Sequence, residues 1–205
     1  SLDGRTALAS GASKWITSAA SREDVQRWRA RSSAILTASG TAGADDPRLT
    51  VRLDGDICKP LRVVLDARLE VPAGANLLDG TAPTLVLHAP DARPDTRHAN
   101  VETAAVEIRD GRLDLQAVLA LLAARGVNEL QVEAGPRLCG ALFAAGLVDE
   151  LLLYVAPSLF GDDARPLLAL PPLASMDVRP QFRVIDSRRI GDDMRLLLRP
   201  LPKQA

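Results

Sequence analysis

Aromatic side chains are scarce in this sequence of 205 residues, which has 2 tryptophans, 1 tyrosine and 3 phenylalanines. Proteins that bind single-stranded nucleic acids stack the bases on aromatic side chains. A cationic field is also lacking, because 25 basic residues oppose 26 acidic ones and leave a net charge of −1. Binding to nucleic acids and to anionic membranes depends on such a field. The composition therefore argues against both kinds of partner.

Cysteine is scarce, with only two residues, and long apolar runs are missing. The two cysteines, Cys58 and Cys139, lie far apart and form no CxxC motif or cluster with histidine. We therefore expect two reduced thiols, with no disulfide framework and no metal site. No apolar run approaches the roughly 20 residues that a membrane-spanning helix needs, and no signal peptide opens the sequence. These absences predict a cytoplasmic protein.

The sequence has enough hydrophobic residues to form a full core, because they make up 47% of the chain. A chain of this length buries roughly 70% of the surface that its unfolded form exposes. No internal repeat, low-complexity tract or long linker divides it, which predicts a single domain over residues 1–205. The abrupt start at Ser1, without an initiator methionine, predicts that this domain is a fragment of a longer polypeptide.

The first half of the sequence alternates one helix with several strands. A capping-box spacing, with Ser21 three residues before Asp24, predicts a helix from residue 18. Short apolar runs bounded by proline or glycine predict buried strands. A cluster of glycine, aspartate and proline between the first two strands predicts a long loop. The strands are expected at residues 33–37, 61–66 and 84–88, and the loop at residues 39–47.

The second half predicts a strand–helix–strand unit and a hairpin. A helix is expected over residues 113–125, where apolar residues recur at helical spacing and Gly126 follows. The segments NELQVEAGP, RLCGALFAAG and VDELLLYVAP then predict a βαβ unit, and residues 182–190 and 194–199 flank a Gly-Asp turn. We therefore predict a three-layer α/β fold: a mixed, mostly parallel sheet, helices on both faces and an antiparallel C-terminal hairpin.

The segment from Glu133 to Gly140 is the first candidate site. Its strand ends at a glycine-containing turn that leads directly into a helix, whose first turn has free N–H groups and a positive dipole end. Phosphate groups bind at such helix starts. The spacing is not GxGxxG, however, and Gly-Pro turns before helices are common in α/β proteins. The Glu133 carboxylate can accept hydrogen bonds from a polar ring, or it can pair with a nearby arginine.

The loop from Ser39 to Arg52 is the second candidate. It combines glycines, hydroxyls, two adjacent carboxylates and two arginines, which suits a sugar phosphate. An Asp-Asp-Pro sequence is also a frequent turn former, so a plain surface turn is the alternative. Arg29, late in the first helix, is either a second cation for the same phosphate or a solvated residue.

Nucleophilic catalysis has little support in the sequence. There is no GxSxG motif, and neither His88 nor His98 belongs to a recognisable dyad or metal spacing. Both are expected to be surface or strand-end histidines. No catalytic residue is assigned, and chemistry without histidine, cysteine or metal points to a cofactor.

Four stretches, in order and at compatible spacing, carry a resemblance that covers almost the whole chain: SLDGRTALASGASKWITS, RARSSAILTASGTAGADDPRLTVR, RVVLD and GVNELQVEAGPRLCGALFAAGLVDELLLYVAPSLFG. They resemble the C-terminal reductase domain of the bacterial bifunctional riboflavin-biosynthesis deaminase/reductase, which has a dihydrofolate-reductase-like fold. The resemblance implies an NADPH-dependent reductase that converts 5-amino-6-(5-phosphoribosylamino)uracil, a phosphorylated pyrimidine, into its ribitylamino counterpart. It also implies a homodimer, and a zinc deaminase domain fused upstream in the full-length protein.

Site residues follow from the same resemblance. The residues that match substrate positions are Ser13, Arg29, Leu49, Arg52 and Glu133. The residues that match NADPH positions are Trp15, Thr41, Asp45, Gly135, Pro136, Arg137, Leu138, Cys139, Gly140 and Ala141. Without the resemblance, Trp15 is equally well explained as a core aromatic residue.

Two alternatives to this function stay open. A same-fold reductase could act on a pterin or dihydrofolate, although paired arginines suit a sugar phosphate better. A non-catalytic nucleotide-binding domain could use the same helix start without transferring hydride.

Overall fold

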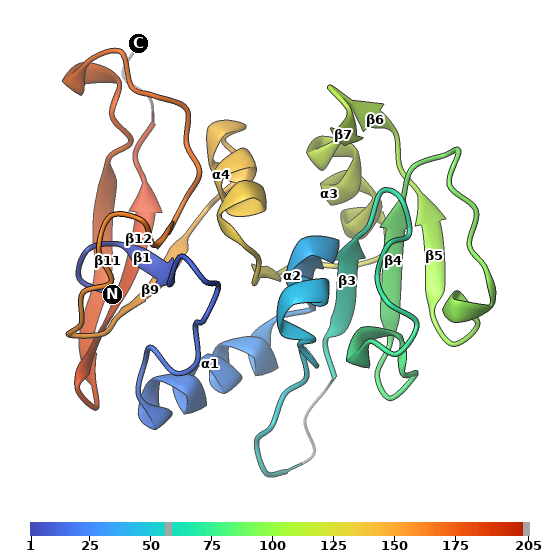
Figure 1. The fold of residues 1–205 in the computed structure, drawn as a ribbon, viewed down its shortest axis with the longest axis horizontal. Coiled ribbons are helices and arrows are strands. Elements are labelled where there is room, and N and C mark those ends of the chain that lie inside the picture. Colours follow the sequence, from blue (N-terminus) through green and yellow to red (C-terminus); the bar gives the residue numbers. More distant parts are fainter. Residues whose placement is uncertain (56–58, 203–205) are drawn as a thin grey trace. The chain divides into compact units, whose positions relative to one another are not determined.

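The computed structural model describes residues 1–55 and 59–202 of the chain (Figure 1). The chain divides into two compact units. The first comprises residues 1–25 and 136–205, and the second comprises residues 26–135. Cys58, one of the two thiols expected to be reduced, lies outside the described residues, and Cys139 takes part in no disulfide among the described residues. In the described part of the chain, no helix is long and apolar enough to cross a bilayer.

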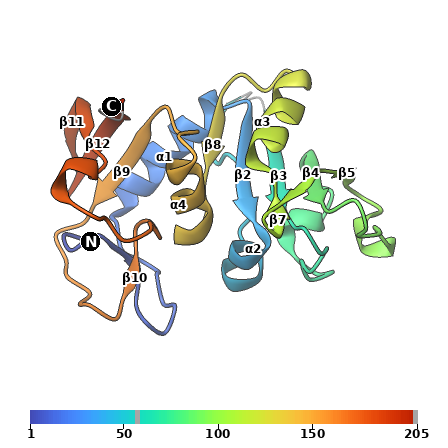
Figure 2. The same cartoon turned by 90° about the horizontal axis from the view of Figure 1, so that it is seen from above.

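A five-stranded parallel sheet forms the centre of the second unit. Val, Ile and Leu dominate its three middle strands, nearly all of whose residues are buried, as strands covered on both faces require. The order across the sheet is β5-β4-β3-β2-β8 (Figure 2). The strands are β2 (Ala34–Ala38), β3 (Leu61–Leu65), β4 (Thr84–His88), β5 (Glu102–Ala105) and β8 (Leu130–Val132).

Two of the connections between parallel strands run across the sheet in opposite directions. Helix α2 (Ser39–Asp45) lies in the connection from β2 to β3, and α3 (Leu115–Ala124) lies in the connection from β5 back to β8 (Figure 2). Because crossovers between parallel strands are right-handed, opposite directions put the two helices on opposite faces. The Asp114 side chain caps α3 by accepting hydrogen bonds from the backbone N–H groups of Gln116 and Ala117.

The loop expected over residues 39–47 is wrong, because most of it is α2. Two glycines give this short segment a low helix propensity, which is why its sequence predicts a loop. Tertiary packing overrides that preference, since Ala42 is buried in the core of the second unit. The helix ends at Asp46, whose backbone is left-handed (φ 41°), and Pro47 follows.

Short elements complete the second unit. Two-stranded pairing joins β6 (Ile108–Arg109) to β7 (Arg112–Leu113), and the 3₁₀ helices are η1 (Asn76–Leu78) and η2 (Thr96–His98). His88 ends β4, as expected. His98 is not a surface residue, because it is 4% exposed and its ring accepts a hydrogen bond from the backbone N–H of Asp95 at the start of η2.

The first unit contains an antiparallel sheet in the order β11-β12-β9. The expected C-terminal hairpin is confirmed, with β11 (Phe182–Ile190) paired to β12 (Asp193–Pro200) across Gly191-Asp192, and β9 (Leu151–Val155) pairs with β12. The other elements of this unit are β1 (Arg5–Ala7), β10 (Arg165–Pro166), η3 (Met176–Val178) and α4 (Pro136–Ala144). Strand β1 pairs with β10.

Helix α1 (Ala19–Arg31) begins in the first unit and runs into the second. The expected helix is confirmed, but the expected cap is not. Ser18 caps the helix, because its side-chain oxygen accepts a hydrogen bond from the backbone N–H of Ser21 at 3.3 Å. The Ser21 hydroxyl instead donates to Asp193 of β12 at 2.6 Å. A side-chain partner 172 positions along the chain is invisible to a local capping pattern.

The predicted fold class is confirmed: an α/β chain with a parallel sheet, helices and an antiparallel C-terminal hairpin. One detail differs. The strand–helix–strand order of β8, α4 and β9 is as expected, but β9 is hydrogen-bonded to β12 and β8 to β2, so the parallel and antiparallel strands belong to separate sheets.

Asp193 supplies a test of how the first unit is held together. Its carboxylate is 2% exposed and accepts hydrogen bonds from the backbone N–H of Ser18 at 2.7 Å and from Ser21. Burial raises the pKa of Asp193, but these hydrogen bonds outweigh it and hold the pKa below the usual range. The stabilisation is therefore complete above the unfolded pKa of about 3.9 and is lost as the pH falls through the folded value.

We predict that Asp193→Ala lowers the free energy of unfolding by about 2 kcal/mol at pH 7, because charged hydrogen bonds are lost inside the protein. The difference from the unchanged chain should shrink below about pH 4. Urea denaturation at several pH values measures both quantities. Asp192→Ala, one residue earlier and exposed, is the control and should change stability by less than about 0.5 kcal/mol. A loss that is equal at pH 7 and pH 3 would contradict the electrostatic explanation.

Candidate functional site

The carboxyl ends of two neighbouring parallel strands bring together four of the predicted site residues of the second unit, Arg29, Thr41, Glu133 and Gly135. Strand β2 pairs with β8, and the backbone N–H of Glu133, just after β8, continues the ladder to the carbonyl of Leu36 at 2.8 Å. Two residues later, the backbone N–H of Gly135 donates to the hydroxyl of Thr41 at 3.2 Å. Open α/β sheets place their ligands at this edge.

Arg29 and Glu133 form a bidentate ion pair at the same edge. Arg29 Nε donates to Glu133 Oε1 at 2.7 Å, and a terminal nitrogen donates to Oε2 at 2.6 Å. The side chains are 12% and 25% exposed. The remaining terminal nitrogen of Arg29 donates to the carbonyl of Thr50 at 3.0 Å, and Gln131 donates to Glu133 Oε1 at 2.7 Å. Arg29 is therefore not a solvated helix residue.

This arrangement changes what each side chain can offer a ligand. Three of the five N–H groups of Arg29 have acceptors in the protein, so a phosphate would have to share the guanidinium with Glu133. The Glu133 carboxylate already accepts three hydrogen bonds and has about one lone-pair direction left. Both alternatives drawn from the sequence for Glu133, an arginine partner and an acceptor for a polar ring, are compatible with this geometry.

Leu49 and Arg52 lie in the segment that follows α2. Leu49 has a left-handed backbone (φ 47°) and is 3% exposed in the hydrophobic core. The backbone N–H of Arg52 donates to Gln26 Oε1 at 3.0 Å, which fixes the chain there, while its side chain is exposed. No side chain or carbonyl among residues 1–55 and 59–202 pairs with the Arg52 guanidinium, so it is available to an anion.

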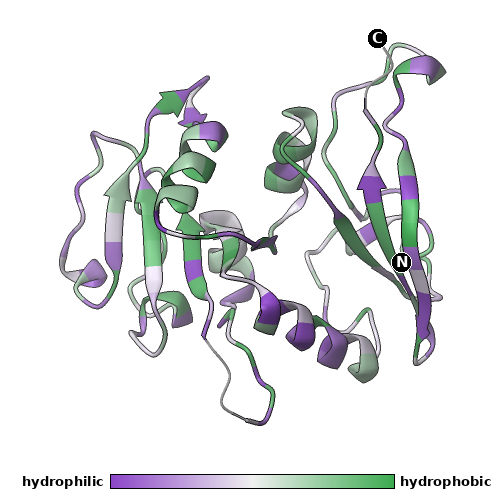
Figure 3. Cartoon of the chain, turned by 180° about the vertical axis from the view of Figure 1, so that it is seen from behind, coloured by the Kyte–Doolittle hydropathy of each residue, from purple (hydrophilic) through white to green (hydrophobic). Residues whose placement is uncertain are grey.

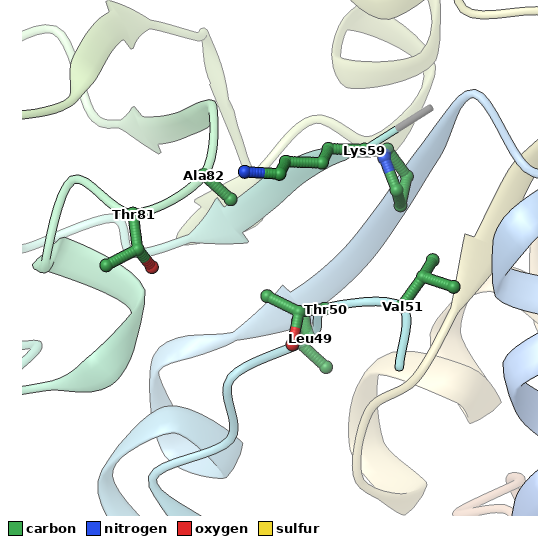
Figure 4. A pocket seen from close by; sticks show the side chains of 7 residues that line it. Leu49, Thr50, Val51, Lys59, Thr81 and Ala82 are labelled. Carbon is green, nitrogen blue, oxygen red and sulfur yellow. The ribbon is translucent and has the colours of Figure 1, made fainter. Parts of the chain in front are cut away.

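A hollow of about 220 Å³ lies beside Leu49 (Figure 4). Pro60 precedes β3 and Ala82 precedes β4, so the hollow is at the amino ends of these strands, opposite the edge that carries Glu133 and Thr41. Its lining residues are Leu49, Thr50, Val51, Lys59, Pro60, Thr81 and Ala82. None of the other predicted site residues lines it.

The predicted residues of the first unit include one exposed aromatic ring. Trp15 is 71% exposed, so the alternative of a core aromatic residue is wrong. The Arg22 guanidinium lies 4.3 Å from the centre of its ring, and this cation–π contact holds one face of the indole. Ser13, two residues earlier, is half-buried. The segment therefore presents a ring that can stack against a planar ligand.

The run from Pro136 to Ala141 forms the first turns of α4. Arg137 is exposed, while Pro136, Leu138, Cys139 and Ala141 are half-buried. Proline occupies the first helical position, where its missing N–H costs nothing. The following N–H groups of this first turn lack intrahelical acceptors, which suits an anion.

Gly140 has a structural explanation. A Cβ atom there would overlap the backbone carbonyl of Ala169 and lie 3.0 Å from its nitrogen. The Ala169 N–H also donates to the carbonyl of Pro136 at 3.0 Å. Of the two purposes that the sequence suggests for Gly140, the structure shows close packing. A close approach of the ligand at Gly140 stays a prediction.

Sequence reasoning missed a buried polar cluster in the first unit. Arg195 donates to Asp24 at 2.9 Å and to Asp186 at 2.7 Å, and the Tyr154 hydroxyl donates to the same Asp24 oxygen at 2.6 Å. Burial and Asp24 raise the pKa of Tyr154, and Arg195 lowers the pKa of Asp186. The four residues come from α1, β9, β11 and β12, so no local motif signals the cluster.

Asp45 is exposed at the last position of α2, four residues after Thr41. Within the described ranges, no group of three or more His, Cys, Asp or Glu side chains is placed to hold a metal ion.

The structure is that of an α/β protein with a candidate ligand site at the carboxyl ends of its parallel strands. Comparison with known proteins then gives the family. Residues 1–196 match the RibD C-terminal domain family, and the chain belongs to that family. The expected family resemblance is thereby confirmed.

Individual relatives agree with this assignment. The riboflavin biosynthesis protein RibD of Escherichia coli K12 is 43% identical over 97% of this chain and 57% of its own length. The protein of Buchnera aphidicola (Acyrthosiphon pisum) named 5-amino-6-(5-phosphoribosylamino)uracil reductase is 31% identical over 94% of this chain and 99% of its own length. The chain thus spans a little over half of the RibD relatives and nearly all of the named reductase.

A solved structure shows the same fold. RibD of Acinetobacter baumannii superposes with a TM-score of 0.86 at 34% identity, covering 98% of this chain and 55% of that one. A Thermotoga maritima protein described as a diaminohydroxyphosphoribosylaminopyrimidine deaminase/5-amino-6-(5-phosphoribosylamino)uracil reductase gives a TM-score of 0.82 at 26% identity, with 98% and 54% covered.

Proposed function

We propose that the chain is a 5-amino-6-(5-phosphoribosylamino)uracil reductase of riboflavin biosynthesis that uses NADPH. One observation carries the proposal: the Buchnera aphidicola relative with this name has nearly the same extent as the chain, with 94% of one aligned to 99% of the other. The name therefore refers to a protein built from this domain. The sugar phosphate and the polar ring of the substrate match the arginines and the carboxylate of the site.

The residues present fit a nicotinamide dinucleotide. The exposed ring of Trp15 offers a stacking surface, and the first turn of α4 offers backbone N–H groups to a phosphate. The Thr41 hydroxyl, which already accepts from Gly135, keeps its own O–H to donate. When bound, NADPH supplies the hydride. Asp45 and residues Gly135 to Ala141 are proposed to complete this part of the site.

The substrate is proposed to lie against Ser13, Arg29, Leu49, Arg52 and Glu133. Arg52 provides a free guanidinium for the phosphate, and the remaining N–H groups of Arg29 provide further donors. Glu133 accepts an N–H or O–H from the pyrimidine or the opened sugar. The acceptor of the hydride is ribose C1′ in the ring-opened imine form. No side chain is assigned as the proton donor.

Positioning is the main contribution of this chain to the rate. The Arg29–Glu133 pair and its contacts with Thr50 and Gln131 hold both side chains before a ligand arrives. Holding the reacting atoms about 3 to 3.5 Å apart converts a bimolecular step into an effectively unimolecular one.

NADPH oxidation at 340 nm, in the presence of the phosphoribosylamino pyrimidine, tests the proposed function. We expect turnover that requires both compounds, with the ribitylamino product identified by mass spectrometry. Dihydrofolate in place of the pyrimidine tests the pterin alternative. NADPH binding in a calorimeter without hydride transfer to either acceptor would favour a binding module and overturn the proposal.

We predict that Arg52→Ala raises KM for the pyrimidine about tenfold, because a charge-assisted hydrogen bond to phosphate is worth roughly 1.5–3 kcal/mol. The value of kcat should stay within about twofold, since the phosphate is remote from C1′. Initial rates at varied substrate concentration measure both. Arg48→Ala, an exposed arginine of the same segment, is the matched control. An unchanged KM in Arg52→Ala would refute the phosphate contact.

We also propose that the chain forms a homodimer. Strand β11 is nine residues long, lies at the edge of its sheet and carries both hydrophobic and hydrophilic stretches (Figure 3). Val184 and Ile185 of this strand are 58% and 42% exposed. Long apolar edge strands tend to pair with other chains. Light scattering should give twice the chain mass of 21.8 kDa, and Val184→Lys should shift the protein toward the monomer. A monomer at all concentrations would refute the dimer.

A further inference from the structure

Arg165, which no motif or resemblance assigns to the site, lies against the segment that carries Ser13 and Trp15. Strand β10 places it, because Arg165 is in register with Ala7 of β1. The chain turns just after β1, where the Gly11 N–H donates to the carbonyl of Leu8 at 2.9 Å. The Arg165 side chain reaches this turn from the neighbouring strand.

The guanidinium of Arg165 covers the α-carbon of Gly11. A Cβ atom at Gly11 would lie 2.9 Å from one terminal nitrogen, 3.4 Å from Cζ and 3.8 Å from the other terminal nitrogen. Gly11 also has a left-handed backbone (φ 92°), which favours glycine on its own account. Two independent constraints therefore keep this position open for the guanidinium.

The charge of Arg165 is uncompensated by direct contact. Throughout the described part of the chain, no carboxylate or carbonyl pairs with its guanidinium, and the residue is exposed. Asp162 is only three positions away, yet it faces Arg5 at 3.8 Å. Arg22, another cation near this segment, is already engaged, since it covers Trp15 and donates to the carbonyl of Thr17 at 2.6 Å.

We propose that Arg165 binds a phosphate group of one of the two ligands of the reductase, at the segment that carries Ser13 and Trp15. The proposal rests on the proposed function. A planar guanidinium laid on a glycine backbone keeps its outer N–H groups free. Phosphate matches that fork in shape and charge. The phosphate belongs either to the pyrimidine substrate or to NADPH.

Steady-state kinetics of Arg165→Gln distinguish the two sources. If the substrate phosphate is bound, KM for the phosphorylated pyrimidine rises about tenfold while KM for its dephosphorylated form stays unchanged. If the 2′-phosphate of the cofactor is bound, KM rises about tenfold for NADPH and not for NADH. If the pyrophosphate is bound, KM rises for both cofactors. Each of these three patterns supports the proposal.

Arg165→Met separates phosphate binding from a packing role, because it keeps most of the alkyl chain beside Gly11 and removes the charge. Under the proposal, both variants show the same KM pattern and nearly unchanged melting temperatures. Arg112→Gln, an exposed arginine of β7, is the control for the loss of one positive charge. KM values within twofold of the unchanged chain, or equal losses for phosphorylated and unphosphorylated ligands, overturn the proposal.

If the chain is not a reductase, the experiment gives a different result. In that case the unchanged chain has no turnover, and calorimetric titration with NADPH and with inorganic pyrophosphate tests Arg165 directly. Binding that weakens about tenfold in Arg165→Gln for either probe supports the phosphate contact. Unchanged or absent binding of both probes overturns it.

Discussion

The bidentate pair between Arg29 and Glu133 is the interaction on which the candidate site of the second unit depends. It joins the last turns of α1 to the end of β8, 104 positions later in the chain. Two fixed hydrogen bonds orient both groups at once, and Thr50 and Gln131 use part of the remaining hydrogen-bonding capacity. A lysine could not replace Arg29, because an ammonium group lacks the planar fork.

A second arginine, inside the sheet, likewise uses all three nitrogens of its guanidinium group in hydrogen bonds within the protein. Arg62 of β3 is fully buried and donates to Thr84, to the carbonyls of Asn76 and Ala82, and to Asp79 at 3.2 Å. A buried charge is tolerated only when paired and hydrogen-bonded, and all three of its nitrogens are. The high arginine content therefore includes structural ions as well as solvated ones. Arg52 and Arg165 differ from both by keeping their guanidinium groups unpaired among the described residues.

The sequence predicts the long helices and the buried strands β2, β3 and β4 well, because apolar runs and helical spacing are local properties, but it does not predict β5, whose residues are partly exposed. It does not predict α2, whose glycines suggest a loop and whose helix is held by the burial of Ala42. It also misplaces the cap of α1, since Ser21 bonds to Asp193 of β12 rather than to its own helix. The site residues are named by family resemblance, but the pairing of Arg29 with Glu133 is a long-range contact that no spacing reveals.

Glycine positions illustrate why a motif alone does not define a ligand site. Both Gly140 and Gly11 lie in segments proposed to bind ligands, and both are close to other atoms. At Gly140 the neighbour is the backbone of Ala169, which cannot move aside, so the glycine serves packing there. At Gly11 the neighbour is the flexible end of Arg165, a charged group with free donors. The neighbour of a glycine therefore indicates its role. Fixed backbone indicates a packing requirement, and a charged side chain with free donors indicates a candidate contact with a ligand.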